Sequence, residues 1–388
     1  MNEPTVSCRI RHVGRSPAEL GRDAIRGAKD AHVDVISLSG APGHSLPEHV
    51  LAEVAAASRT TTHSIHSGGI AELRHAISRK VEAKTGVTVS AETQVIVTNG
   101  AMHGLLASAM ALADTNDEVL IPSPCYFFRG NFELAGLKPV YAPSRAEDGW
   151  ALNWPLLEQA IGERTRILCL TTPNNPTGYM LTMEDLDRIT SLVRGRNIWV
   201  ISDESYESVT FDNRKLVGPI SHPDLRERTI TVKTFSKGYC LRDYRVGYVV
   251  APNAQVGEAI RGGVEWSVLS TSYVGQRAAL AALEGPEDWI ADMVAQVRAN
   301  RDKMEARLRP CNRVSWVSPQ GGPYLYVDVS QLGGAEAVCD QLLNRYGVAT
   351  LPASAFKDEG HIRVPFGGPS DRMDEAAERL SRAFSEIS

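Results

Sequence analysis

Short β-branched apolar segments alternate with stretches of helical apolar spacing through the middle of this chain, and this alternation constrains its fold most strongly. The candidate strands are residues 94–98, 118–122, 166–171, 197–202, 229–233 and 245–250, with candidate helices at 101–113 and 183–193. Several strands are apolar at every position, as expected for a strand covered by helices on both faces. The pattern predicts an α/β fold with a mostly parallel central sheet and helices on both of its faces.

A second architecture is predicted after the turn at residues 284–286. A long charged helix is expected at 289–309 and is followed by strand signals at 315–319, 324–329 and 361–366. Helical patterns at 335–346 and 371–386 complete a smaller α+β unit. We therefore expect a large domain at residues 45–285 and a small domain built from residues 1–44 and 286–388.

Charge and cysteine usage exclude several classes of protein. Lys plus Arg is 41 and Asp plus Glu is 46 in the 388 residues, which gives a formal net charge of −5. An acidic balance argues against nonspecific nucleic-acid binding, which needs a basic surface. The six cysteines are widely spaced, so neither a disulfide framework nor a metal site is expected. The chain shows no signal-peptide pattern and no apolar run long enough to span a membrane, so we expect a cytoplasmic protein.

Polar and glycine-rich segments follow the predicted strands, at the sheet edge where open α/β proteins bind ligands. They are residues 97–102, 122–126, 173–178, 203–206 and 234–237, with Arg245 shortly afterwards. A strand-to-helix turn at Gly100 would present backbone N–H groups to an anion, and nearby hydroxyls would add to a phosphate site. Lys237 follows a buried strand, where desolvation would make its amine a nucleophile. Asp203 ends another strand and is suited to hold a pyridinium nitrogen.

Read together, the segments NNPTG, DESY and TFSK followed by RVGY resemble the class I/II aminotransferases of fold type I, from about Val35 to Phe366. The resemblance implies pyridoxal 5′-phosphate as cofactor and a homodimer with the active site at the subunit interface. It also implies an amino acid and a keto acid as substrates, and places the internal aldimine on Lys237 and the pyridine-nitrogen salt bridge on Asp203.

The same resemblance assigns further residues to the site. Tyr126 would stack on the cofactor ring, while Gly40, Asn175 and Arg363 would face the substrate, with Arg363 holding its α-carboxylate. The remaining cofactor contacts, at the phosphate and at the phenolic oxygen, would come from Gly100, Ala101, Met102, Asn175, Tyr206, Thr234, Ser236 and Arg245.

The chain departs from the family pattern at a few positions. Ser64 stands where a tyrosine usually reaches the neighbouring subunit's cofactor, with His63 and His66 on either side. Asp243 replaces a glycine before the phosphate-binding arginine, and His44 lies close to the substrate segment.

Transamination of an α-amino acid is the first expectation. Two alternatives stay open. The altered region around Ser64 leaves room for a specialised elimination, cyclisation or oxidation of an amino acid, and a different class altogether is a noncatalytic amino-acid sensor.

Overall fold

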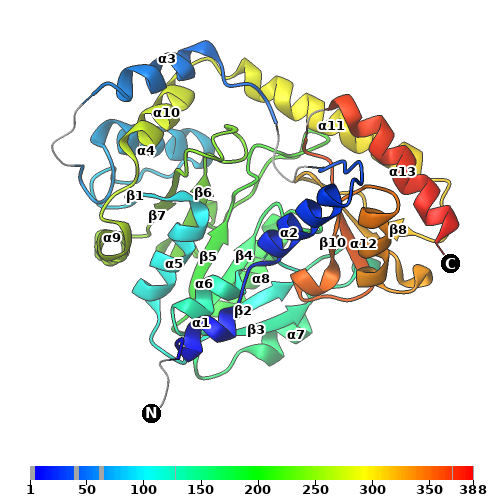
Figure 1. The fold of residues 1–388 in the computed structure, drawn as a ribbon. Helices are drawn as coiled ribbons and strands as arrows, with labels where there is room; N and C mark the ends of the chain where they lie inside the picture. The colour runs from blue at the N-terminus through cyan, green and yellow to red at the C-terminus, as the bar shows by residue number, and fades with distance from the viewer. Residues whose placement is uncertain (1–4, 39–42, 61–64, 127, 369, 388) are drawn as a thin grey trace.

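A seven-stranded sheet dominates the computed structural model, which describes residues 5–38, 43–60, 65–126, 128–368 and 370–387 (Figure 1). Its strands are β1 (Val95–Thr98), β2 (Glu118–Ser123), β3 (Lys138–Pro143), β4 (Thr165–Thr171), β5 (Trp199–Asp203), β6 (Thr229–Thr234) and β7 (Gly247–Val250). They are ordered β1-β7-β6-β5-β4-β2-β3, and only β7 runs against the other strands of this sheet. The predicted mostly parallel sheet is confirmed.

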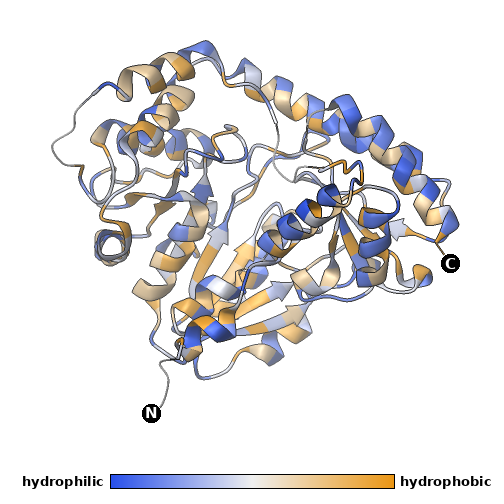
Figure 2. Ribbon diagram, in the orientation of Figure 1, coloured by the Kyte–Doolittle hydropathy of each residue, from blue (hydrophilic) through white to orange (hydrophobic). Residues whose placement is uncertain are grey.

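Helices cover both faces of this sheet. One face packs on α5 (Gly100–Leu112), α6 (Arg129–Leu134) and α9 (Ala254–Val268). The other packs on α3 (Glu48–Ala57), α4 (Ala71–Thr85), α7 (Trp154–Ala160), α8 (Met183–Val193) and α10 (Tyr273–Glu284). Leu120 and Ile121 are adjacent in β2 yet belong to cores on opposite faces. Because both faces of the inner strands are buried, these strands are mostly apolar (Figure 2).

A second, fully antiparallel sheet follows in the chain. It contains β8 (Ser315–Trp316), β9 (Tyr324–Asp328), β10 (Leu351–Pro352) and β11 (His361–Pro365), in the order β10-β11-β9-β8. It shares a core with α11 (Asp288–Leu308), α12 (Ala335–Asn344) and α13 (Met373–Glu386). Helices α11 and α13 lie side by side in Figure 1. The domain boundaries expected from the sequence stay a prediction.

Short 3₁₀ helices connect these elements. They are η1 (Ala146–Asp148), η2 (Pro219–Ser221), η3 (Arg226–Arg228), η4 (Ser330–Leu332), η5 (Ala353–Phe356) and η6 (Ser370–Arg372). None of the helices in the described ranges is long and apolar enough to cross a bilayer.

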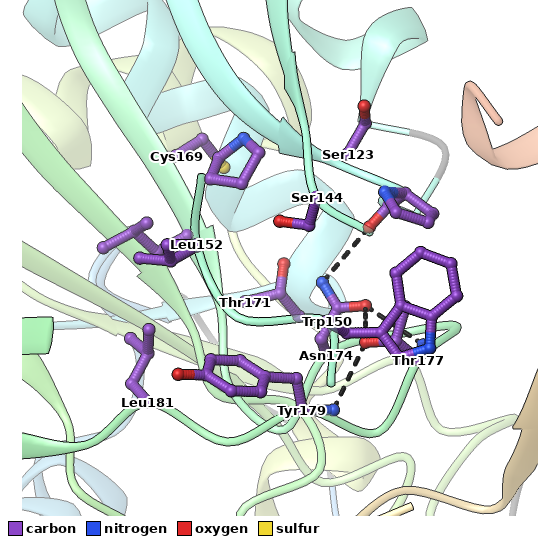
Figure 3. Close-up of a pocket in the computed structure, with 13 residues that line it drawn as sticks. Ser123, Ser144, Trp150, Leu152, Cys169, Thr171, Asn174, Thr177, Tyr179 and Leu181 are labelled. Atoms are coloured by element: carbon purple, nitrogen blue, oxygen red, sulfur yellow. Dashed lines mark hydrogen bonds between the residues drawn. The ribbon is translucent and has the colours of Figure 1, made fainter. Parts of the chain in front are cut away.

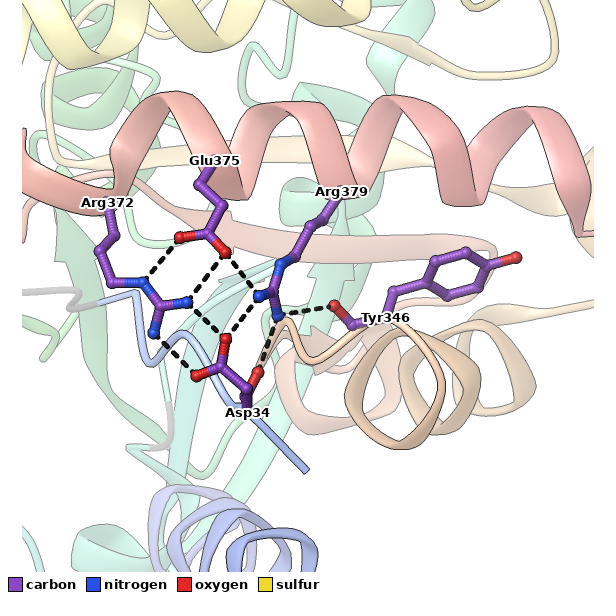
Figure 4. Close-up of polar contacts among 5 residues, drawn as sticks. All are labelled: Asp34, Tyr346, Arg372, Glu375 and Arg379. Atoms are coloured by element: carbon purple, nitrogen blue, oxygen red, sulfur yellow. Dashed lines mark hydrogen bonds and ion pairs between the residues drawn. The ribbon is translucent and has the colours of Figure 1, made fainter. Parts of the chain in front are cut away.

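The chain begins with α1 (Cys8–Val13) and α2 (Pro17–Asp30), and a cluster of ion pairs fixes the segment after α2 (Figure 4). The Asp34 carboxylate accepts hydrogen bonds from Arg372 at 3.0 and 2.6 Å and from Arg379 at 2.5 Å. These two guanidinium groups hold the pKa of Asp34 well below its usual range. The cluster ties the segment that follows α2 to α13, and α2 in turn contributes residues to a cavity at one edge of the large sheet.

Candidate active site

The carboxyl ends of the parallel strands meet at one edge of the large sheet and border a cavity of about 510 Å³. Because β7 is antiparallel, it begins at this same edge, and Arg245 just before it joins the site. The predicted site residues that line the cavity are Ala101, Met102, Tyr126, Asn175, Asp203, Tyr206, Thr234, Ser236, Lys237, Arg245 and Arg363. Gly100 lies directly behind Arg245, and Gly40 lies outside the described residues.

Lys237 and Asp203 are the two ionisable groups whose pKa values are most relevant to chemistry in this cavity. Removal from water lowers the pKa of Lys237 to about 7, and the positive charges of Arg242 and Arg363 act in the same direction. Burial raises the pKa of Asp203 to about 6, although its Oδ1 accepts a hydrogen bond from the Ser205 N–H at 2.9 Å. Near neutral pH, a large fraction of Lys237 is therefore an uncharged, nucleophilic amine.

One end of the cavity has the features of a phosphate site. The Thr234 hydroxyl donates to the Ser236 hydroxyl at 2.9 Å, and the first turn of α5 has no side-chain cap. Gly100 has φ +75°, and a Cβ at this position would lie 2.6 Å from Nη2 of Arg245. Only glycine therefore lets this guanidinium lie against the start of α5. Hydroxyls, helix N–H groups and a guanidinium together suit a phosphate dianion.

The other end of the cavity is formed by Arg363, which is contributed by β11 of the second sheet and is 8% exposed. Its Nη1 donates to Oδ1 of Asn175 at 3.0 Å. Its Cζ lies 4.3 Å from the ring centroid of Tyr324 and 4.9 Å from that of Phe356. These contacts orient the planar Arg363 guanidinium, whose N–H groups match the two oxygens of a carboxylate.

Asn175 reaches the cavity because the preceding residue holds the turn (Figure 3). The Asn174 Oδ1 accepts hydrogen bonds from the N–H of Thr177 at 3.1 Å and from its hydroxyl at 3.0 Å. The Asn174 side-chain amide donates to the carbonyl of Pro124 at 3.4 Å. A small cavity of about 20 Å³ lies beside this turn. The sequence NNPTG thus encodes a rigid turn as well as a cavity residue.

Several cavity residues were not predicted as site residues from the sequence. Arg22 from α2, Arg242 after Lys237 and Tyr324 from β9 all line the cavity. Arg22 and Tyr324 lie in segments that carry no recognisable site motif, so nothing local marked them. Arg242 precedes Asp243, the residue that departs from the family pattern, and that departure was the available signal.

The histidines noted in the sequence do not join the cavity where the structure describes them. The Nδ1 of His44 lies 2.8 Å from the carbonyl of Ser45, and the Nδ1 of His66 accepts from the N–H of Gly68 at 3.1 Å. Burial lowers the pKa of His66, with nearby arginines acting in the same direction, which disfavours its protonated form. His63 and Ser64 lie outside the described residues. Within the described part of the chain, no group of three or more His, Cys, Asp or Glu side chains is placed to hold a metal ion.

Comparisons of this chain with known protein families, sequences and structures agree with one another. The family described as "Aminotransferase class I and II" matches residues 35–380. An aspartate aminotransferase of Musicola paradisiaca is 31% identical, covering 98% of this chain and 97% of that protein. Aromatic-amino-acid aminotransferase 2 of Thermococcus litoralis is 30% identical, covering 91% and 92%. The structure of the aspartate aminotransferase from Rhizobium meliloti is 27% identical and superposes with a TM-score of 0.93 over 100% of both chains.

Proposed function

This chain belongs to the class I and II aminotransferases, and we propose that Lys237, Asp203 and Arg363 carry out amino-group transfer in the cavity that they share. The enzymes of this family use pyridoxal phosphate. Lys237 follows β6, Asp203 ends β5 and Arg363 lies in β11 of the second sheet, yet all three line one cavity. This convergence is the observation that carries the proposal.

The residues present fit pyridoxal phosphate. The close approach of Gly100 and Arg245, with the hydroxyls of Thr234 and Ser236, supports a phosphate site at one end. Asp203 would hold the pyridine nitrogen, because a buried carboxylate favours a cation beside it. Of the other proposed contacts, Tyr126 would touch the face of the cofactor ring, Asn175 and Tyr206 would touch its phenolic oxygen, and Ala101 and Met102 would touch its phosphate.

When bound, pyridoxal phosphate supplies an aldehyde for an amino group and a ring that stabilises negative charge at the substrate Cα. Arg363 would bind the substrate carboxylate through two parallel hydrogen bonds and so orient the Cα–H bond. Lys237, whose pKa lies near 7, would remove the proton from Cα and return it to the former aldehyde carbon of the cofactor. Asp203 would keep a proton on the pyridine nitrogen throughout.

We propose that the preferred substrates carry a second anionic group on their side chain. Beyond the residues assigned above, the lining adds the cations Arg22 and Arg242 and the carboxylate Asp243, and Arg22 is ion-paired with Glu19 of the same helix. The two guanidinium groups favour a side-chain carboxylate over its neutral amide, because only the carboxylate can form an ion pair with them. Comparing kcat/KM for glutamate with glutamine, and for aspartate with asparagine, tests this preference. Equal values for acid and amide would contradict it.

We also propose a homodimer in the cytoplasm. Helices α5 and α9 pack together, and Met110 of α5, Trp266 of α9 and Leu269 directly after α9 are 44%, 91% and 69% exposed. Large exposed apolar side chains on contacting elements favour a protein interface. The six cysteines are all unpaired thiols, which favours a reducing compartment. Sedimentation should give a dimer for the wild type and a monomer for Trp266→Asp, and a monomeric wild type would refute the proposal.

We further propose the two-domain division expected from the sequence, with a large domain at residues 45–285 and a small domain from residues 1–44 and 286–388. Its support is that the second sheet has its own core and adds Arg363 to a cavity whose other walls come mainly from the first sheet.

A half-reaction without an acceptor keto acid tests the proposed reaction. The holoenzyme is mixed with each standard amino acid in turn while the cofactor spectrum and the products are followed. Transamination predicts one keto acid per active site and cofactor left in its aminated form. Elimination or cyclisation would return the aldehyde form over many turnovers, oxidation would consume oxygen, and a sensor would bind without product. Any of these three results would overturn the proposed reaction.

A further inference from the structure

Tyr324 is a buried tyrosine at the start of β9 that the proposed chemistry has not used. It is 3% exposed, lines the cavity that holds Lys237 and Asp203, and belongs to the second sheet. Its hydroxyl oxygen lies 2.5 Å from that of Tyr206, and the two rings meet edge to face with centroids 5.7 Å apart. A phenol that follows β5 of the first sheet and a phenol of the second sheet are thus joined directly inside the cavity.

The hydrogen-bond inventory of the two phenols gives the pair a direction. A tyrosine hydroxyl has one proton to donate and can accept from other donors. Tyr206 is proposed to donate its single proton to the phenolic oxygen of the cofactor. It then has no proton left for Tyr324, so the Tyr324 hydroxyl must be the donor between the two. Burial raises the pKa of Tyr206 well above its ordinary value, so this residue keeps its proton.

The ring of Tyr324 makes a second and separate contact. The Arg363 guanidinium carbon lies 4.3 Å from the centroid of this ring, with the Phe356 ring at 4.9 Å. A buried guanidinium next to aromatic rings is stabilised by the cation–π interaction and is held in one plane. Tyr324 therefore touches both Tyr206 at the cofactor end and Arg363 at the carboxylate end.

We propose that Tyr324 is a positioning residue that acts on both ends of the site, orienting the Tyr206 proton through its hydroxyl and supporting Arg363 through its ring. The inference rests on the proposed function, because it uses the roles given there to Tyr206 and Arg363. Its two contacts come from different parts of one side chain, so substitutions can separate them.

Tyr324→Phe removes the hydroxyl and keeps the ring. Without a donor from Tyr324, the Tyr206 O–H is less polarised, and its hydrogen bond to the cofactor oxygen weakens. That bond stabilises negative charge on the phenolic oxygen of the cofactor. This charge is largest after the Lys237 nitrogen that is joined to the cofactor has lost its proton. The pH midpoint of the cofactor absorbance change should therefore rise, by about half a unit. The midpoint reports a proton at Lys237, and the charged groups that face this residue are Arg242, Arg363, Asp203 and Arg245, with Tyr126 close to the tyrosine pair.

Tyr324→Leu removes both the hydroxyl and the ring. We expect the same rise in the absorbance midpoint and, in addition, a roughly tenfold rise in KM for the standard amino acid that the wild type converts fastest. Tyr324→Phe should change this KM by less than about twofold, because the ring under Arg363 remains.

Tyr346→Phe is the matched control. Its hydroxyl donates to Glu386 at 2.9 Å, and the residue is 3% exposed, yet it lies outside the cavity. The Tyr346→Phe holoenzyme should show the same pH midpoint of the absorbance change as the wild type.

The absorbance titration uses the holoenzyme without substrate, so it does not depend on which reaction follows. An unchanged midpoint in Tyr324→Phe overturns the role of the hydroxyl, and an unchanged KM in folded Tyr324→Leu overturns the role of the ring. Failure of the proposed function itself would be seen in the wild type, as the absence of a keto acid product.

Discussion

Replacing Gly100 by alanine tests how the cofactor's phosphate is held. The added Cβ would lie 2.6 Å from Nη2 of Arg245, so the guanidinium must move away from the start of α5. A hydrogen bond to a charged group contributes about 1.5–3 kcal/mol. At about 1.4 kcal/mol per factor of ten, losing one such bond weakens cofactor binding roughly ten- to 150-fold.

Gly86→Ala is the matched control for this substitution. Gly86 has φ +71°, close to the +75° of Gly100, but a Cβ there meets no atom within 4 Å. Both variants incur the left-handed strain of an L-residue, about 1–2 kcal/mol of unfolding free energy. Urea unfolding of the apoproteins measures that common loss, and titration with pyridoxal phosphate measures binding. The reasoning is refuted if Gly100→Ala binds cofactor as tightly as Gly86→Ala does.

Three further predictions follow from buried charges. The apoenzyme should capture pyridoxal phosphate about tenfold faster per pH unit up to about pH 7 and level off above it, because the pKa of Lys237 is about 7. In Arg242→Gln the pH at which the capture rate levels off should be higher, since one positive charge near Lys237 is lost. An unchanged pH in stopped-flow measurements would contradict this. Asp203→Ala should bind cofactor yet lose most of kcat in steady-state assays at saturating cofactor, and near wild-type kcat would argue against its role. Lys233→Met should lower the urea-derived unfolding free energy by about 3–5 kcal/mol, because buried Glu204 loses its ion-pair partner at 3.0 Å, while Glu207 loses one partner at 2.6 Å and keeps Lys80. Exposed Lys138→Met should change it by less than about 0.5 kcal/mol, and equal losses would refute the reasoning.

The sequence predicted the elements whose apolar pattern is strong and missed those whose pattern is weak. All six strands expected in the large sheet are present, because burial on both faces leaves a continuous apolar signal. Strand β3 was missed because it contains Pro139 and Pro143, and proline argues against a strand. The structure places β3 at the edge of the sheet, where a missing N–H is tolerated. Strand β10 was missed because one of its two residues is Pro352, and proline argues against a strand.

The cavity shows the same division. Residues that follow strands in recognisable segments, such as Asp203 and Lys237, were predicted and line the cavity. Tyr324 and Arg22 reach it from β9 and α2, elements that are far apart in sequence and meet only through tertiary packing. No local pattern encodes that meeting.

The most direct test of this account is to find which lysine carries the cofactor. The holoenzyme is reduced with borohydride, digested and analysed by mass spectrometry, with Lys237→Ala treated in parallel. The account predicts a pyridoxyl group on Lys237 of the wild type and no specific label in the variant. A pyridoxyl group on another lysine, or cofactor retained by the wild type with no lysine labelled, would contradict it.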